Sequence, residues 1–110
     1  MTEQKTGNSN GQPQLTIASA YLQAIEHFNA ERYPESDQLC TAIIKAAPNH
    51  TNALNLLGVI AQRVSRHDLA VEQFTRAINI DSKKAIFYYN LGVSLNSLGY
   101  SEKAQQTLKT

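Results

Sequence analysis

The sequence predicts an all-α protein built from repeated pairs of antiparallel helices, and three observations lead to this fold class. From Leu15 onward, apolar residues recur at the three- and four-residue spacing of a helix face. The alternation of apolar and polar residues that is typical of strands never persists for more than a few residues. The chain also aligns with itself, without a gap, when it is shifted by one fixed period.

The period is 34 residues, and it preserves the size of side chains better than their identity. Residues 57–59 and 91–93 both read Leu-Gly-Val, and Ala70 falls on Ala104. In the earliest unit small residues still fall on small ones, and large apolar residues mostly fall on large ones. A repeated helix pair requires this pattern, because the same contacts recur in each unit.

The middle unit indicates which residues pack the two helices together. One face of its first helix and one face of its second are formed by Leu54, Leu57, Gly58 and Ala61, and by Ala70, Phe74, Ala77 and Ile78. A glycine inside a helix costs about 1 kcal/mol relative to alanine, so Gly58 needs a packing reason. We expect Gly58 and Ala70 to let the backbones approach, with Phe74 filling the space beside them.

The elements follow in order from the amino terminus. Residues 1–13 are polar and small, so we expect a disordered tail before a repeat domain over 14–110. The expected first helices cover 15–30, 51–64 and 85–98, and the expected second helices cover 34–46, 68–80 and 101–110. Pro34 suits an opening helical turn, and Ser101 is a plausible N-cap. The last helix is shorter than its counterparts, so the array looks cut short or uncapped.

These residues resemble the tetratricopeptide repeat, whose pattern is W-x-x-L-G-x-x-Y, then A-x-x-x-F, and a closing proline. The middle unit carries Leu-x-x-Leu-Gly-x-x-Ala from Leu54, followed by Ala70 and Phe74, and in the third unit Tyr88 takes the tryptophan position. The resemblance implies a right-handed α-solenoid fragment of about three helix pairs, with units near 17–50, 51–84 and 85–110. The repeat-packing residues are Ala24, Ser36, Cys40, Leu57, Gly58, Ala70, Phe74, Ala77, Leu91, Gly92, Ala104 and Leu108.

In this family the first helix of each unit lines a concave groove, so the resemblance implies a peptide-binding site there. The groove residues it indicates are Tyr21, Leu22, Ile25, Asn52, Asn55, Leu56, Val59, Arg63, Ile86, Tyr89, Asn90, Val93 and Asn96. Their amides suit a partner's main chain and their apolar groups suit its side chains, as for an extended peptide or a partner helix. The alternatives are that these residues pack against neighbouring helices, or that the open ends and the groove pair with another copy in a homodimer.

One mode of binding in this family can be tested on the sequence. Domains that hold the acidic tails of heat-shock chaperones use a clamp of lysine, asparagine and arginine side chains over three first helices. The corresponding positions here are Tyr21, Ile25, Leu56, Ile86 and Asn90. Four of these five side chains cannot bind a carboxylate, so we do not expect an acidic chaperone tail as the partner.

A second resemblance concerns the larger setting of such repeats. Residues 52–61 and 89–92 are similar to the repeats that precede the catalytic part of protein O-glycosyltransferases and of some bacterial methyl- and sulfotransferases. It implies a third alternative, in which the array presents acceptor proteins to a transferase. No transferase chemistry is encoded within these 110 residues.

The remaining features argue against other function classes. The formal net charge is +1 and the longest basic run is Lys83-Lys84, so nucleic acid and anionic membranes are not expected as partners. The chain carries no nucleotide-binding, metalloprotease or CxxC motif, and its histidines do not pair at metal spacing, so we predict neither an enzyme nor a cofactor. A single cysteine, Cys40, and the lack of an apolar leader at the start predict a cytoplasmic protein.

Overall fold

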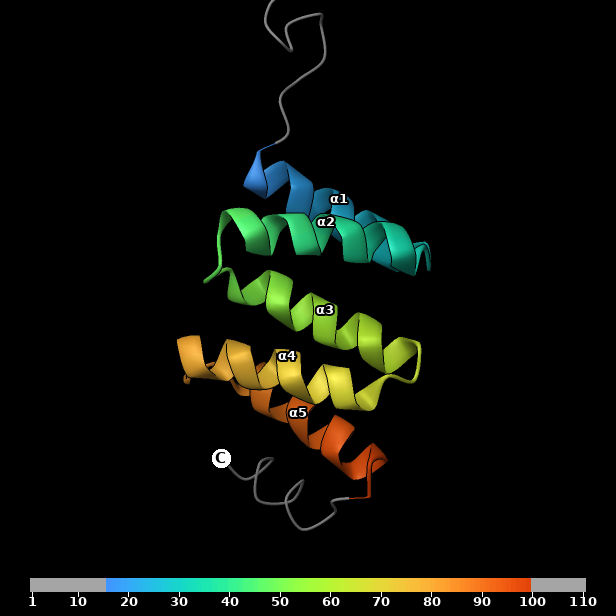
Figure 1. The fold of residues 1–110 in the computed structure, drawn as a ribbon, viewed down its shortest axis with the longest axis vertical. Helices are drawn as coiled ribbons and strands as arrows, with labels where there is room; N and C mark the ends of the chain where they lie inside the picture. Colours follow the sequence, from blue (N-terminus) through green and yellow to red (C-terminus); the bar gives the residue numbers. More distant parts are fainter. Residues whose placement is uncertain (1–15, 100–110) are drawn as a thin grey trace, which may run out of the picture.

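The computed structural model describes residues 16–99, which form a stack of five helices and no strand between those limits (Figure 1). The helices are α1 (Ile17–Asn29), α2 (Tyr33–Ala46), α3 (Thr51–Arg63), α4 (His67–Ile80) and α5 (Ala85–Ser97). The predicted all-α array of helix pairs is confirmed, and the five expected helix ranges agree with these bounds within two residues. The expected tail, the helix over 101–110, Ser101, Ala104 and Leu108 lie outside the described residues.

Side chains cap the first turns of α1 and α3, and a proline lies in the first turn of α2. Thr16 and Ser19 form a reciprocal capping box at α1, with 3.0 Å from each backbone nitrogen to the other residue's hydroxyl oxygen. Nδ1 of His50 accepts a hydrogen bond from the amide of Ala53 at the start of α3. Pro34 lies in the first turn of α2, where its missing amide costs no helical hydrogen bond.

The turns inside each helix pair repeat with the same period as the helices. Glu31 and Ser65 both have a φ of 62°, and Gly99 has a φ of 89°, so the three left-handed residues are spaced by the repeat length. The next residue closes each of the first two turns, because the amides of Arg32 and Arg66 donate to carbonyls five residues earlier. The backbone conformation of the turns therefore recurs with the repeat, as the helices do.

Neighbouring helices pack through a core that runs along the stack. Figure 1 shows α2 in front of α1 and α4 in front of α5, and α3 lies between α2 and α4. One core cluster joins α1, α2 and α3, and smaller clusters join α3 to α4 and α4 to α5. The predicted packing residues Ala24, Ser36, Cys40, Gly58, Ala70, Phe74, Ala77 and Gly92 are buried, and Leu57 and Leu91 are half-buried. No helix within residues 16–99 is long and apolar enough to cross a membrane.

Candidate functional site

We define the first-helix face as the predicted groove residues of α1, α3 and α5, together with Gln62. Most of these residues reach the surface. The exposed members are Leu22, Asn52, Arg63, Ile86, Tyr89, Val93 and Asn96, and the half-buried members are Tyr21, Ile25, Asn55, Val59, Gln62 and Asn90. Ile86, Tyr89 and Val93 form an apolar row along α5 that is 52%, 56% and 37% exposed.

Leu56 is the exception, and the prediction that it lines the groove is wrong. Its side chain is only 8% exposed and belongs to the core cluster that contains Ala53, Ile60 and Cys40. Successive residues of a helix are turned by roughly 100°, so the neighbour of the half-buried Asn55 points into the protein. Leu56 therefore joins α3 to the first helix pair and is not available to a partner.

The amides of the first-helix face bond to one another across α3 and α5. Nδ2 of Asn90 donates to Oδ1 of Asn55 over 2.9 Å. Nε2 of Gln62 donates to the carbonyl of Asn90 over 3.1 Å and to the hydroxyl of Ser94 over 2.8 Å. These side chains were expected at the margins of a groove, but part of their bonding capacity holds two repeats together.

The same pair of asparagines still has groups to offer. Nδ2 of Asn55 and Oδ1 of Asn90 have no hydrogen-bond partner among the described residues. Neither atom is buried, since the one buried unpartnered side-chain polar atom within 16–99 belongs to His67. The pair thus presents an amide donor and an amide acceptor side by side at the surface.

Two cations flank this arrangement, and both are held in place by aromatic rings. The guanidinium of Arg63 lies 5.0 Å from the centre of the Phe28 ring, and its Nη1 is 3.4 Å from the hydroxyl of Tyr33. Nζ of Lys84 bonds Oδ1 of Asn52 over 3.3 Å and lies 5.5 Å from the centre of the Phe87 ring. Since α3 and α5 contain no acidic residue, this part of the first-helix face is neutral to weakly basic.

The described residues do not bring together the ligands of a metal site. No set of three histidine, cysteine or acidic side chains between residues 16 and 99 could hold a metal ion. Burial, with a smaller contribution from the charge of Asp37, raises the pKa of the Cys40 thiol to about 12. The thiol is therefore protonated at neutral pH and is a poor nucleophile.

Sequence reasoning missed the contacts made between units. The bonds of Gln62 and the ring under Arg63 join residues from different repeats, and no spacing within one helix indicates them. A pocket between α2, α3 and α4 was also missed, although it contains the charged residues Asp37 and Arg66. The 34-residue alignment could have indicated it, because the position corresponding to Asp37 in the next unit is Val71.

Comparisons with known proteins agree with this architecture. The sequence model of a family described as "Tetratricopeptide repeat" matches residues 51–84 and 85–110, which is more than half of the chain. No curated protein sequence matches the chain.

Several solved structures share the fold. A crystal structure of MamA superposes with a TM-score of 0.81 at 18% identity, over 86% of this chain and 55% of that one. A mutant O-GlcNAc transferase of Thermobaculum terrenum gives 0.81 at 28% identity, over 84% of this chain and 18% of that one. The second tetratricopeptide domain of Spaghetti (RPAP3), bound to the HSP90 peptide SRMEEVD, gives 0.81 at 17% identity, over 84% and 86%. The chain thus spans about half the length of the MamA structure.

Proposed function

Because the chain belongs to the tetratricopeptide repeat family, we propose that it is a protein-interaction module whose first-helix face binds an extended peptide of a partner protein. The observation that carries this proposal is the exposed apolar row of Ile86, Tyr89 and Val93 beside the free amide atoms of Asn55 and Asn90. Exposed apolar side chains next to unpaired donors and acceptors are the features of a peptide site.

In this proposal the asparagine pair binds the main chain and the apolar row binds side chains. Nδ2 of Asn55 donates to a peptide carbonyl, and Oδ1 of Asn90 accepts from a peptide amide. Each large apolar side chain that becomes fully buried contributes about 1.5–3 kcal/mol. Three such anchors contribute about 5–9 kcal/mol before the cost of association, so micromolar binding, which corresponds to about 8 kcal/mol, also needs the main-chain hydrogen bonds.

Peptides selected from a random-peptide display library provide the test, with affinities measured by fluorescence anisotropy. We expect Tyr89→Lys and Val93→Lys to weaken the selected peptides by about tenfold or more, since both changes place a charge in the apolar row. Ile80→Lys is the matched control, because Ile80 is an exposed apolar residue of α4. Equal losses in the control, or unchanged binding to both variants, would show that the first-helix face is not the site.

The acidic peptide SRMEEVD is a second probe, and we expect it not to bind. It is bound in the Spaghetti (RPAP3) structure. Of the positions that correspond to the chaperone clamp, Tyr21, Ile25 and Ile86 carry no cation and Leu56 is buried. Saturable micromolar binding of this peptide would overturn the expectation and would direct attention to Arg63 and Lys84.

Presentation of acceptor proteins to a transferase is a second candidate function. It is favoured by the 28% identity with the O-GlcNAc transferase, of which this chain covers 18%. This function would use the same first-helix face. Sequencing the reading frame downstream of Thr110 tests it, because a transferase domain there would favour this function over that of a separate adaptor. Self-association is the remaining alternative, and sedimentation over a range of concentrations tests it, since a dimer should be lost in the Tyr89→Lys variant.

The proposal also includes the domain organisation and the compartment. We take residues 1–13 as a polar tail and 17–50, 51–84 and 85–110 as the repeat units of a cytoplasmic protein. Limited proteolysis should then cut within the tail before it cuts within α1 to α5, because closely packed helices resist proteases. A first cut inside the helical stack, identified by mass spectrometry, would contradict this division.

A further inference from the structure

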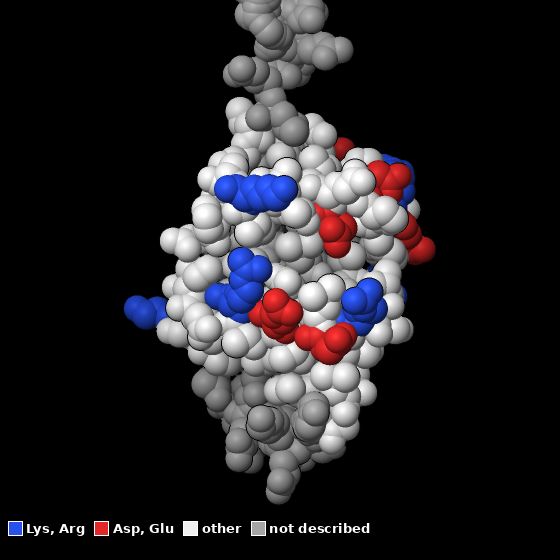
Figure 2. Space-filling model, in the orientation of Figure 1, with Lys and Arg blue, Asp and Glu red and all other residues white. Residues whose placement is uncertain are grey.

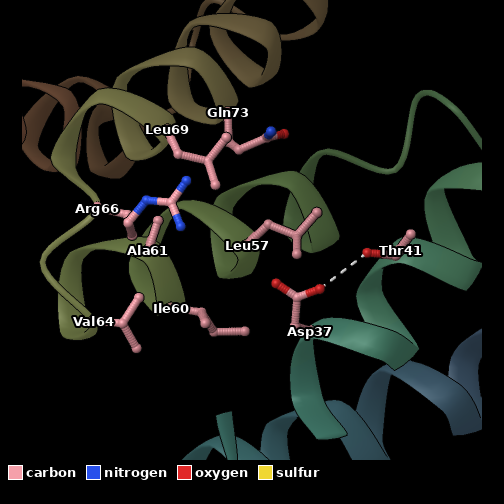
Figure 3. A pocket seen from close by; sticks show the side chains of 9 residues that line it. All are labelled: Asp37, Thr41, Leu57, Ile60, Ala61, Val64, Arg66, Leu69 and Gln73. Atoms are coloured by element: carbon pink, nitrogen blue, oxygen red, sulfur yellow. Dashed lines mark hydrogen bonds between the residues drawn. The ribbon is translucent and has the colours of Figure 1, made fainter. Parts of the chain in front are cut away.

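A pocket of about 290 Å³ lies between α2, α3 and α4. We call it the second-helix pocket, because α2, α4 and the turn before α4 line it, together with Leu57, Ile60 and Ala61 of α3. Its apolar surface includes Leu57, Ile60, Val64 and Leu69, and Figure 3 shows these side chains around the opening. None of these residues belongs to the first-helix face, so the pocket is a separate feature.

Two opposite charges face this pocket from different walls. Asp37 comes from α2 and Arg66 from the turn before α4, and Figure 3 shows both side chains directed toward the space between them. Within residues 16–99 the two make no ion pair with each other. Asp37 accepts one bond, over 3.3 Å, from the hydroxyl of Thr41, which leaves most of its acceptor capacity available.

The position of Arg66 is set by its backbone. Its amide donates to the carbonyl of Ala61 over 2.7 Å, and its own carbonyl accepts from the amide of Ala70 over 3.0 Å. The preceding residue, Ser65, occupies the left-handed region with a φ of 62°. The turn therefore fixes the backbone of Arg66 beside the pocket, and the side chain makes no capping hydrogen bond.

The charge of Asp37 is not required by the repeat, whereas Arg66 falls on Arg32 of the first unit. A shift of 34 residues places Val71 on Asp37, so an apolar residue serves at the same position of the next unit. Figure 2 shows acidic and basic side chains interspersed over the face on which α2 and α4 lie in front, so this face is not uniformly basic. The pocket therefore combines an apolar surface with one carboxylate and one guanidinium.

The apolar surface continues beyond the pocket. A neighbouring hollow of about 370 Å³ shares Asp37, Ile60 and Val64 with it and extends to Tyr33 and Pro34. Val64 is 48% exposed at the junction of the two hollows. Asp37 thus lies at the middle of an elongated surface, whereas Arg66 lies toward one end, and an extended chain could contact both.

We propose that the second-helix pocket is a second protein-docking site, which takes an apolar side chain of a partner segment flanked by a basic and an acidic residue. Charge complementarity selects this occupant: the basic residue meets Asp37 and the acidic residue meets Arg66. A wholly acidic segment would place a negative charge beside Asp37, and a wholly basic segment would place a positive charge beside Arg66. A pocket of this volume holds one or two side chains and is at the lower limit of small-molecule sites.

Three series of capped peptides test the proposal, with two or three leucines between Lys and Glu, between Lys and Lys, or between Glu and Glu ends. Binding is followed by NMR shifts of the methyl groups of Leu57, Ile60, Val64 and Leu69. We expect the peptides with mixed ends to bind the wild-type chain about tenfold more tightly than either like-charged series. A lack of shifts for every series at millimolar peptide, or equal affinities, would overturn the proposal.

Charge reversal makes the test specific, and both residues are exposed, so the variants are expected to fold. Asp37→Lys should transfer the preference to the Glu and Glu series, and Arg66→Glu should transfer it to the Lys and Lys series. The double variant should again prefer mixed ends, because it carries one charge of each sign. Circular dichroism melts check folding, and preferences that do not follow the charges would contradict the assignment of both residues.

A matched control separates this site from the first-helix face. Tyr89→Lys should leave the peptide preferences of the second-helix pocket unchanged, since Tyr89 lies on α5 and does not line it. Conversely, Asp37→Lys should leave the binding of library-selected peptides unchanged. Loss of both activities in either variant would mean that the two surfaces form one site, which the proposal excludes.

Discussion

The two complete helix pairs meet at corresponding positions but fill the contact in different ways. The corresponding residues are Ala24 and Gly58, Ser36 and Ala70, and Cys40 and Phe74. In the α1–α2 pair three small residues are buried, and the hydroxyl of Ser36 donates to the carbonyl of Ala24 over 2.7 Å. In the α3–α4 pair the ring of Phe74 lies directly over Gly58.

The difference shows that a larger side chain on one helix of a pair is accommodated by a smaller residue on the other. A β-carbon at position 58 would lie 2.6 Å from Cζ and 2.7 Å from Cδ1 of Phe74, closer than real contacts allow. In the first pair Cys40 leaves room for the methyl group of Ala24. A large residue such as Phe74 on one helix thus requires glycine on the other. The first pair has no aromatic ring at this contact and has instead the hydrogen bond from Ser36 to Ala24.

The largest expected effect is that of Phe74→Ala, which removes the ring from the second pair. Phe74 is fully buried, and replacing such a residue with alanine leaves a cavity and costs about 3–5 kcal/mol. Urea denaturation followed by circular dichroism measures the loss. Cys40→Ala at the corresponding position of the first pair should cost less, because fewer atoms are removed. Equal losses at the two positions would contradict the comparison.

Gly58→Ala should have the next largest effect. It should lower the free energy of unfolding, although helix propensity alone would raise it. Alanine favours a helix by about 1 kcal/mol relative to glycine, but its methyl group would displace the Phe74 ring at a cost of about 1–3 kcal/mol. In a Phe74→Cys background, which reproduces the first pair, the same change should become neutral or stabilising. Additive effects in this double-mutant cycle would show that the two residues do not interact.

Ser36→Ala tests the hydrogen bond that distinguishes the first pair. The Ser36 hydroxyl is fully buried, and loss of its bond to Ala24 should lower the free energy of unfolding by about 1 kcal/mol. Ala70→Ser is the reciprocal change in the second pair. It should be tolerated if its hydroxyl finds the carbonyl of Gly58. An unchanged melting temperature for Ser36→Ala would indicate that volume alone sustains the first pair.

The smallest effect at neutral pH concerns Cys40, whose burial raises the thiol pKa from 9.0 to about 12. Since the folded thiol ionises at higher pH than the unfolded one, stability is unaffected below about pH 9 and declines as the pH rises toward 12. Denaturation midpoints compared with a Cys40→Ala variant isolate this contribution. The folded chain should also resist thiol reagents at pH 8, and rapid modification without unfolding would contradict the buried position.

The fold could be predicted because its signals lie within one repeat and recur at a fixed period of 34 residues. The spacing of apolar residues, Pro34 in an opening turn, and the small residue at 58 opposite Phe74 all describe neighbours in a single helix pair. The site was predicted less well. Leu56 was placed in the groove because residue spacing alone cannot tell which of two consecutive residues, Asn55 or Leu56, faces outward at the edge of a helix face. Its 8% exposure depends on how α3 packs against the first pair.

The sequence therefore specifies the repeat length, the helix pairs and the size of the residues between them, because these depend on local periodicity and contact volume. Contacts between units depend on how successive pairs are rotated, which no spacing in the chain records. The pairing of Asn55 with Asn90 and the meeting of Asp37 and Arg66 at one pocket arise only when the pairs are stacked. For this reason both proposed binding surfaces are properties of the array and not of any single helix.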